Sequence, residues 1–234
     1  METETEDDNR QRASGRAAFK NSVWFTRAWT LQELLAPKTV LFFSKTYTLL
    51  GTRENFDNLV HEATSIPVYF LGMNLEGVFD ASVAERMRWA SRREASREED
   101  LSYSILGLFG VNIPLLYGEG GKAFLRLQEE IVKTSWDETL FAWNGRSDDC
   151  MQHMLAGGLI ASHPRHFEGA TILGLKFPIP RQHYEITNRG VRMSIPLSRG
   201  QFDRVLAEGM PRRRGLTFSR HRGRGIPQGV LYAS

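Results

Sequence analysis

The stretch Trp24-Phe-Thr-Arg-Ala-Trp-Thr-Leu-Gln-Glu-Leu-Leu-Ala-Pro37 decides the fold of the first part of this chain. It predicts a short helix, because Thr26 can cap its first turn and Pro37 cannot continue its last one. Apolar residues recur at helical spacing and should form the buried face: Trp29, Leu31, Leu34 and Leu35. Gln32 and Glu33 then stand in the middle of an apolar segment, which makes them candidate functional residues.

The composition is typical of a folded protein from a reducing compartment. The chain has 234 residues, of which 41% are hydrophobic and 11% aromatic, enough to bury a sizeable core. The single cysteine, Cys150, excludes an internal disulfide framework. No apolar run reaches the length of a membrane span, and the acidic start is unlike a signal peptide. We therefore expect a cytoplasmic protein.

Charge is unevenly distributed along the chain. Five acids and one arginine fall in the first ten residues, so we expect a disordered acidic tail over residues 1–18. From Arg181 to Arg224 there are eleven arginines against three acids. This run lacks interleaved aromatics and a known reading module, so a solvated basic tail is favoured over a patch for nucleic acid or an anionic membrane.

Periodicity predicts an α/β or α+β fold with helices on a small sheet. Residues 39–44 are rich in strand formers, and residues 47–50 can continue or pair with that strand before Gly51 turns the chain. A helix is expected from Thr52 to Thr64, with its inward face formed by Phe56, Leu59 and Val60. Another is expected from Lys122 to Lys133, with its inward face formed by Ala123, Phe124, Leu127 and Ile131.

Two sequence pairs match the capping box, in which a hydroxyl and a carboxylate three residues apart satisfy the first turn of a helix. They are Ser82 with Glu85, and Ser96 with Glu99. Two further helices should therefore begin there, and Gly110 is a plausible end for the second. Trp89 and Tyr103 lie on these helices, and we expect both to be buried.

The pattern changes near residue 147, where glycine and proline become frequent and long helices disappear. Residues 184–197 alternate polar and apolar on both sides of an Asn-Arg-Gly turn, which predicts a β-hairpin. We therefore expect a strand-rich extension with a basic C-terminal tail over residues 147–234.

Familiar catalytic templates do not fit. The run Gly118-Glu-Gly-Gly-Lys122 lacks the spacing of a phosphate loop, and Ala123 stands where that loop needs Ser or Thr. A helix entry is the favoured interpretation. The histidines between 153 and 183 are scattered without metal-ligand spacing, so no metal is expected. No Gly-x-Ser-x-Gly elbow is present.

Four ordered blocks carry a resemblance to a known family: the Trp24–Pro37 stretch and the runs Ser82-Val-Ala-Glu-Arg-Met-Arg-Trp-Ala-Ser91, Arg97-Glu-Glu-Asp-Leu-Ser-Tyr-Ser-Ile-Leu-Gly107 and Pro114-Leu-Leu-Tyr-Gly-Glu-Gly-Gly-Lys-Ala-Phe124. They resemble the fungal heterokaryon-incompatibility (HET) domain. The resemblance implies a HET-like domain over residues 19–146. The aromatic front block of that family does not precede Ser22, so we expect the C-terminal part of the domain.

The resemblance also suggests site residues. An Arg with a nearby Glu-Asp pair marks one position in the HET family, and Arg97, Glu99 and Asp100 match it. Arg97 can hold an anionic ligand group or brace the two acids, and bracing is favoured.

The segment Trp29-x-x-x-Glu33-Leu34 is similar to the Trp-Cys-x-x-Glu-Leu segment of TIR domains, with one residue more between the two ends. Some TIR domains cleave NAD with that glutamate, since a carboxylate against an aromatic wall can stabilise the cationic ribosyl carbon. Glu33 is thus a candidate catalytic residue. The ligand-binding candidates are Trp29, Gln32, Arg97, Glu99 and Asp100. A structural role for Glu33, such as pairing with Arg27, is favoured over catalysis.

The resemblance implies an effector of vegetative incompatibility, acting in fungal non-self recognition and programmed cell death through protein partners or self-association. No cofactor is expected, although NAD is a candidate substrate. Two alternatives stay open: a TIR-like NAD glycohydrolase that needs the missing front portion, and an inactive remnant or regulator. Without that portion we expect an exposed apolar patch containing Trp24 or Trp29.

Overall fold

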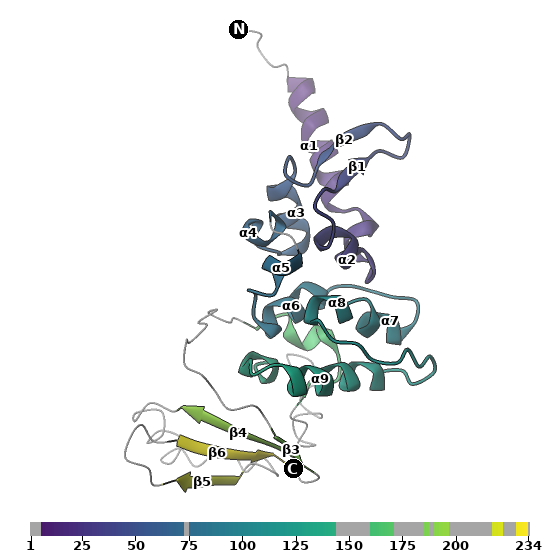
Figure 1. The fold of residues 1–234 in the computed structure, drawn as a ribbon. Helices are drawn as coiled ribbons and strands as arrows, with labels where there is room; N and C mark the ends of the chain where they lie inside the picture. The colour runs from purple at the N-terminus through teal and green to yellow at the C-terminus, as the bar shows by residue number, and fades with distance from the viewer. Residues whose placement is uncertain are drawn as a thin grey trace.

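Short helices dominate the computed structural model of the chain (Figure 1). It describes residues 6–72, 75–143, 160–170, 185–187, 190–196, 217–221 and 228–233. Its α-helices are α1 (Glu6–Lys20), α2 (Thr30–Leu35), α3 (Asp57–Thr64), α4 (Val68–Leu71), α5 (Leu75–Val78), α6 (Val83–Ala90), α7 (Glu98–Tyr103), α8 (Leu106–Phe109) and α9 (Lys122–Thr134). Single 3-10 turns are η1 (Val23–Thr26), η2 (Glu138–Phe141) and η3 (Pro164–Phe167).

The strands form two antiparallel sheets. Strands β1 (Leu41–Phe43) and β2 (Leu49–Thr52) make a hairpin near α1. The second sheet has the order β3-β4-β6-β5, with strands β3 (Glu185–Thr187), β4 (Gly190–Pro196), β5 (Thr217–His221) and β6 (Gln228–Ala233). In Figure 1 this sheet lies at the opposite end from α1, with α6 to α9 between them. The expected mixture of helices and small sheets is confirmed.

Helix α2 buries the face that the sequence predicts, with one exception. Leu31, Leu34 and Leu35 are fully buried. Trp29 is 40% exposed, because the helix begins only at Thr30 and Trp29 stands at its N-cap position without a capping bond. The expected cap by Thr26 is therefore wrong: Thr26 ends η1 and donates to the carbonyl of Val23 (3.0 Å).

The first residues differ from the disordered tail expected over residues 1–18, since α1 begins at Glu6. Its last turn is anchored by aromatic packing: the ring of Phe19 lies 5.0 Å from those of Phe42 and Phe56. Lys20 Nζ also pairs with Glu62 Oε2 on α3 at 2.7 Å. These contacts come from Phe19 and Lys20, which lie just after the predicted tail.

The β1–β2 hairpin confirms the two expected strands. Arg53, which follows this hairpin, binds backbone carbonyls at the end of α2. Arg53 is 2% exposed. Its Nη1 donates to the carbonyl of Leu34 (2.6 Å) and its Nη2 to that of Lys38 (3.0 Å). These are carbonyls at and beyond the C-terminus of α2, where the helix leaves acceptors unpaired.

Helix α3 starts at Asp57 rather than Thr52, because Asn55 Oδ1 accepts from the Thr52 backbone and holds a turn there.

The first expected capping pair is confirmed on its hydroxyl side, and the second is wrong. Ser82 Oγ accepts from the backbone nitrogen of Glu85 (3.2 Å) at the start of α6. Helix α7 instead begins at Glu98, with Arg97 at its N-cap and no side-chain cap. Gly110 does end α8, in the left-handed conformation (φ 64°) that favours glycine.

The remaining elements agree with the sequence. Helix α9 runs from Lys122 to Thr134 and buries the four expected apolar residues. Strands β3 and β4 form the expected hairpin. The expected boundary near residue 147 and the Arg212-Arg213-Arg214 run lie outside the described residues.

Candidate functional site

The predicted site residues divide between two regions. Glu33 lines a groove of about 530 Å³ between α1, η1, α2 and the β1–β2 hairpin. Aromatic side chains form much of its lining: Phe19, Trp24, Phe25, Phe42 and Phe43. Trp24 meets Phe25 and Phe42 edge to face, with ring centres 5.2 and 5.9 Å apart. An exposed carboxylate beside an aromatic wall is the arrangement that the TIR resemblance implies for Glu33.

Gln32 on α2 and Trp29 just before it do not line this groove with Glu33. Gln32 is half-buried, and its Nε2 lies 3.1 Å from where a Cβ on Gly107 would stand, so its amide rests against α8. Trp29 is 40% exposed ahead of the helix. The ion pairs of the described residues do not include the expected pair between Glu33 and Arg27.

Arg97, Glu99 and Asp100 come together at the loop before α9. Glu99 Oε1 accepts from the backbone nitrogens of Gly118 (2.6 Å) and Gly120 (3.0 Å). Hydrogen bonds from its own backbone, from Gly120 and from Gly118 hold the pKa of Glu99 below its ordinary value. Both glycines have positive φ (99° and 56°), a conformation that only glycine adopts readily.

Tyr117 contacts the other two predicted residues, Arg97 and Asp100. The guanidinium of Arg97 lies 4.8 Å from the centre of its ring, and Asp100 Oδ1 accepts from its hydroxyl (3.1 Å). The hydrogen bond to Asp100 is the main cause that raises the pKa of Tyr117. The three predicted residues thus contact the loop at residues 117–120. The ion pairs of the described residues do not include one from Arg97 to Glu99 or Asp100, so the expected bracing of the two acids stays a prediction.

Sequence reasoning missed the polar core of the same loop. Tyr103, 2% exposed, donates from its hydroxyl to Glu119 Oε1 (2.9 Å) and accepts from the Leu116 nitrogen (2.8 Å). Arg126 on α9 pairs with Glu119 and donates to the carbonyl of Pro114 (2.8 Å). The Gly-Glu-Gly-Gly run was the sequence signal for these contacts, because a turn with several glycines needs side chains from other elements to hold it in place.

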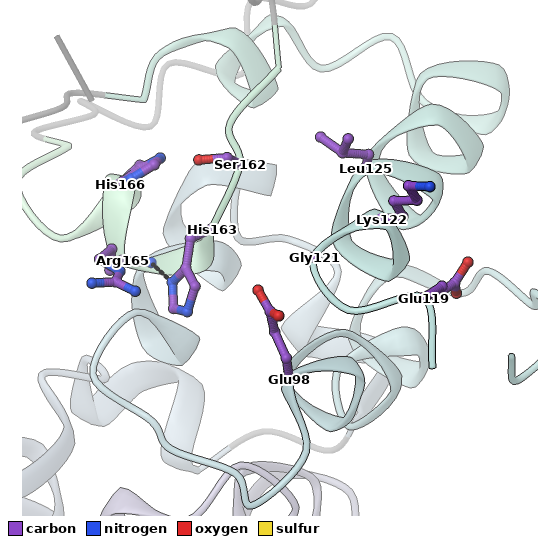
Figure 2. A pocket seen from close by; sticks show the side chains of 9 residues that line it. All are labelled: Glu98, Glu119, Gly121, Lys122, Leu125, Ser162, His163, Arg165 and His166. Atoms are coloured by element: carbon purple, nitrogen blue, oxygen red, sulfur yellow. Dashed lines mark hydrogen bonds between the residues drawn. The ribbon is translucent and has the colours of Figure 1, made fainter. Parts of the chain in front are cut away.

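A polar hollow of about 410 Å³ opens beside this loop, and Figure 2 shows Glu98 and His163 pointing toward one another in it. Its lining comes from α7, α9 and η3: Glu98, Glu119, Gly121, Lys122, Leu125, Ser162, His163, Arg165 and His166. The oxygens of Glu98 lie 3.0 to 3.1 Å from where a Cβ on Gly121 or Gly120 would stand. The glycines therefore leave room for this carboxylate.

His163 is a neutral hydrogen-bond donor in this hollow. Its Nδ1 accepts from the backbone nitrogen of Arg165 (3.0 Å). Burial, followed by the charges of Arg165 and His166, lowers the pKa of His163 to about 4. With Nδ1 occupied as an acceptor, the proton of the neutral ring is on Nε2. His163 can thus orient a polar group, but it has no free basic nitrogen with which to abstract a proton.

Within the described part of the chain, no three His, Cys, Asp or Glu side chains gather in a way that could hold a metal ion. None of the described helices is long and apolar enough to cross a bilayer.

Comparison with known proteins identifies a fungal relative. The vegetative incompatibility protein HET-E-1 of Podospora anserina is 41% identical to this chain over 151 residues, which is 64% of this chain and 10% of that protein. The chain therefore spans about a tenth of the length of the relative it matches. A family model described as a domain of unknown function (DUF8212) matches residues 122–156, which begin with α9. No solved structure matches the chain. The chain is thus related to a fungal vegetative incompatibility protein.

Proposed function

We propose that this chain is a HET-like module of a vegetative incompatibility effector, which acts in the cytoplasm in non-self recognition and programmed cell death. The observation that carries the proposal is the 41% identity to HET-E-1 over 151 residues. It spans too much of the chain to reflect one short motif.

The arrangement of the candidate residues favours an effector that works through protein contacts. The loop at residues 117–120 is contacted by Arg97, Glu99 and Asp100. This role favours three residues that stabilise the loop over three that bind a substrate. The β1–β2 hairpin, in contrast, presents apolar side chains to solvent: Leu41, Phe43, Tyr47, Leu49 and Leu50 are 48 to 89% exposed. Exposed apolar surface of this kind is typical of protein interaction sites.

A chimera tests the proposal directly. The segment of HET-E-1 that matches this chain is replaced by the corresponding residues of this chain, and the chimera is expressed in Podospora anserina. We expect it to retain the incompatibility reaction and cell death on fusion with an incompatible strain. A matched chimera with Trp89→Ala, which the loss of core packing should destabilise, is expected to react more weakly. A silent parent chimera present at the normal level would contradict the proposal and favour an inactive remnant or regulator.

A TIR-like NAD glycohydrolase is the second candidate, and the placement of Glu33 supports it. Glu33 is exposed and lines the aromatic groove beside Trp24, where a carboxylate could stabilise the cation left when nicotinamide departs. The same chimera with Glu33→Gln separates the two candidates, because glutamine keeps the shape and loses the charge. Loss of both NAD depletion and cell death in a folded variant would support catalysis. Full toxicity with unchanged NAD levels would exclude it.

A further inference from the structure

Arg93 is a buried cation that has no carboxylate partner among the residues that the structure describes. It is 5% exposed and follows α6. Its Nε donates to the carbonyl of Trp89 (3.3 Å), and its Nη1 to the carbonyl of Arg27 and the hydroxyl of Thr30 (2.9 Å each). All three acceptors are neutral, and burial lowers the pKa of Arg93 to about 10. A buried charge without a counter-charge is unfavourable, so an anion bound beside Arg93 would stabilise the fold.

Two donors near this cation have no acceptor among the described residues. They are Nη2 of Arg93 and Nε1 of Trp89, and both atoms are buried. Leaving a buried donor unpaired destabilises a fold, yet here two occur within five residues of sequence. Both residues line one cavity of about 180 Å³.

The cavity is lined mainly by positive and hydroxyl side chains. Arg88 and Arg92 line it with Arg93, and Glu168 is the one acid among its described lining residues. That acid is already paired, since Arg92 Nε lies 2.8 Å from Glu168 Oε1. Hydroxyl residues complete the wall: Thr26, Thr64, Ser65 and Ser91. Arg88 pairs with Glu85 at 3.5 Å, so Arg93 is the lining cation that has no acid partner among the described residues. This uncompensated charge favours a negative occupant.

We propose that this cavity between η1, the end of α3 and the end of α6 binds a small oxyanion, a carboxylate or a phosphate group. Arg88 and Arg92 would attract it, and Trp89 Nε1 and Arg93 Nη2 would donate to its oxygens after a small shift of their side chains, because neither atom has exposed surface in this structure. The volume of 180 Å³ compares with about 30 Å³ for one water molecule in the liquid. It suits one oxyanion group and is too small for an entire dinucleotide. The site is separate from the Glu33 groove, with which it shares only Phe25 among the described lining residues.

Titration of the full chain with inorganic phosphate and, separately, acetate tests the proposal and distinguishes the two ligand chemistries. Calorimetry and the fluorescence of the tryptophans report binding. We expect one saturable site for at least one of the two anions. No saturable binding of either anion would overturn the proposal.

Two variants show whether such binding belongs to this cavity. Trp89→Phe keeps an aromatic ring and removes one donor, and Arg88→Gln with Arg92→Gln removes two charges from side chains that are partly or largely exposed. Each should weaken binding about tenfold, as the loss of a charge-assisted hydrogen bond does. Arg16→Gln, a change of an exposed arginine on α1, is the matched control and should bind normally. Unchanged affinity in both cavity variants would overturn the assignment.

Discussion

Glu99 Oε1 lies 2.6 Å from the backbone nitrogen of Gly118, so a carboxylate on α7 holds the loop that leads into α9. The same oxygen accepts from Gly120 at 3.0 Å. The sequence assigns Glu99 to a helix cap, but its carboxylate accepts hydrogen bonds from residues 19 and 21 positions later. Its effect on stability should depend on pH.

Glu99→Gln should lower the melting temperature at neutral pH. It should also make the melting temperature less sensitive to a fall in pH. Since the folded pKa of Glu99 is below its ordinary value of 4.5, the ionised group stabilises the fold above pH 4.5. That contribution disappears as the pH falls through the folded pKa. Melts between pH 7 and pH 3 should show the difference between variant and wild type shrinking. Glu129→Gln, an exposed position on α9, is the control, and a constant difference would contradict the prediction.

Trp89→Ala should lower the free energy of unfolding by about 3 to 5 kcal/mol, as large aromatic truncations in cores do. Trp89 is 2% exposed and packs against Phe70, with ring centres 5.2 Å apart. Denaturant titration followed by circular dichroism measures the change. Trp89→Phe should be far milder, because the ring is kept and a buried unpaired donor is removed. Equal losses in both variants would show that packing is not the cause.

His163→Asn should make stability less sensitive to mild acid. The folded pKa of His163 is lowered to about 4, so the unfolded chain takes up a proton between pH 6.5 and pH 4 that the fold resists. Wild-type stability should therefore fall as pH decreases through that window. Asparagine can still accept from the Arg165 nitrogen, so the turn is kept. Melting curves at pH 7, 5.5 and 4 measure the effect, and parallel pH profiles would argue against a half-buried neutral ring.

Phe43→Lys should reduce self-association of the chain. Phe43 is 54% exposed on β1, beside other apolar side chains of the hairpin, and a charge on such a strand disfavours pairing with another copy. Sedimentation velocity over a concentration series should show the wild type associating and the variant remaining monomeric. Asn21→Lys adds the same charge at an exposed position outside the hairpin and should behave as the wild type. A wild type that stays monomeric would refute the prediction.

Local patterns predicted the elements that depend on neighbours in sequence. The buried face of α2, the bounds of α9, the end of α8 at Gly110 and both hairpins follow from periodicity and turn residues. The Ser96 cap failed because Glu99 is recruited by a loop far along the chain. The helix at Glu6–Lys20 was missed because its support comes from Phe42, Phe56 and Glu62. Such long-range partners leave no periodic signal.

The buried guanidinium of Arg53 makes α2 and the β1–β2 hairpin interdependent during folding. Helix α2 has six residues, too few to persist alone in water. The carbonyls of Leu34 in its last turn and of Lys38 just beyond it are bound by the Arg53 side chain, 19 and 15 positions later. The helix therefore gains this support only when the hairpin has closed. The two elements should open together as one cooperative unit, with their backbone amides exchanging with solvent deuterium at a common rate.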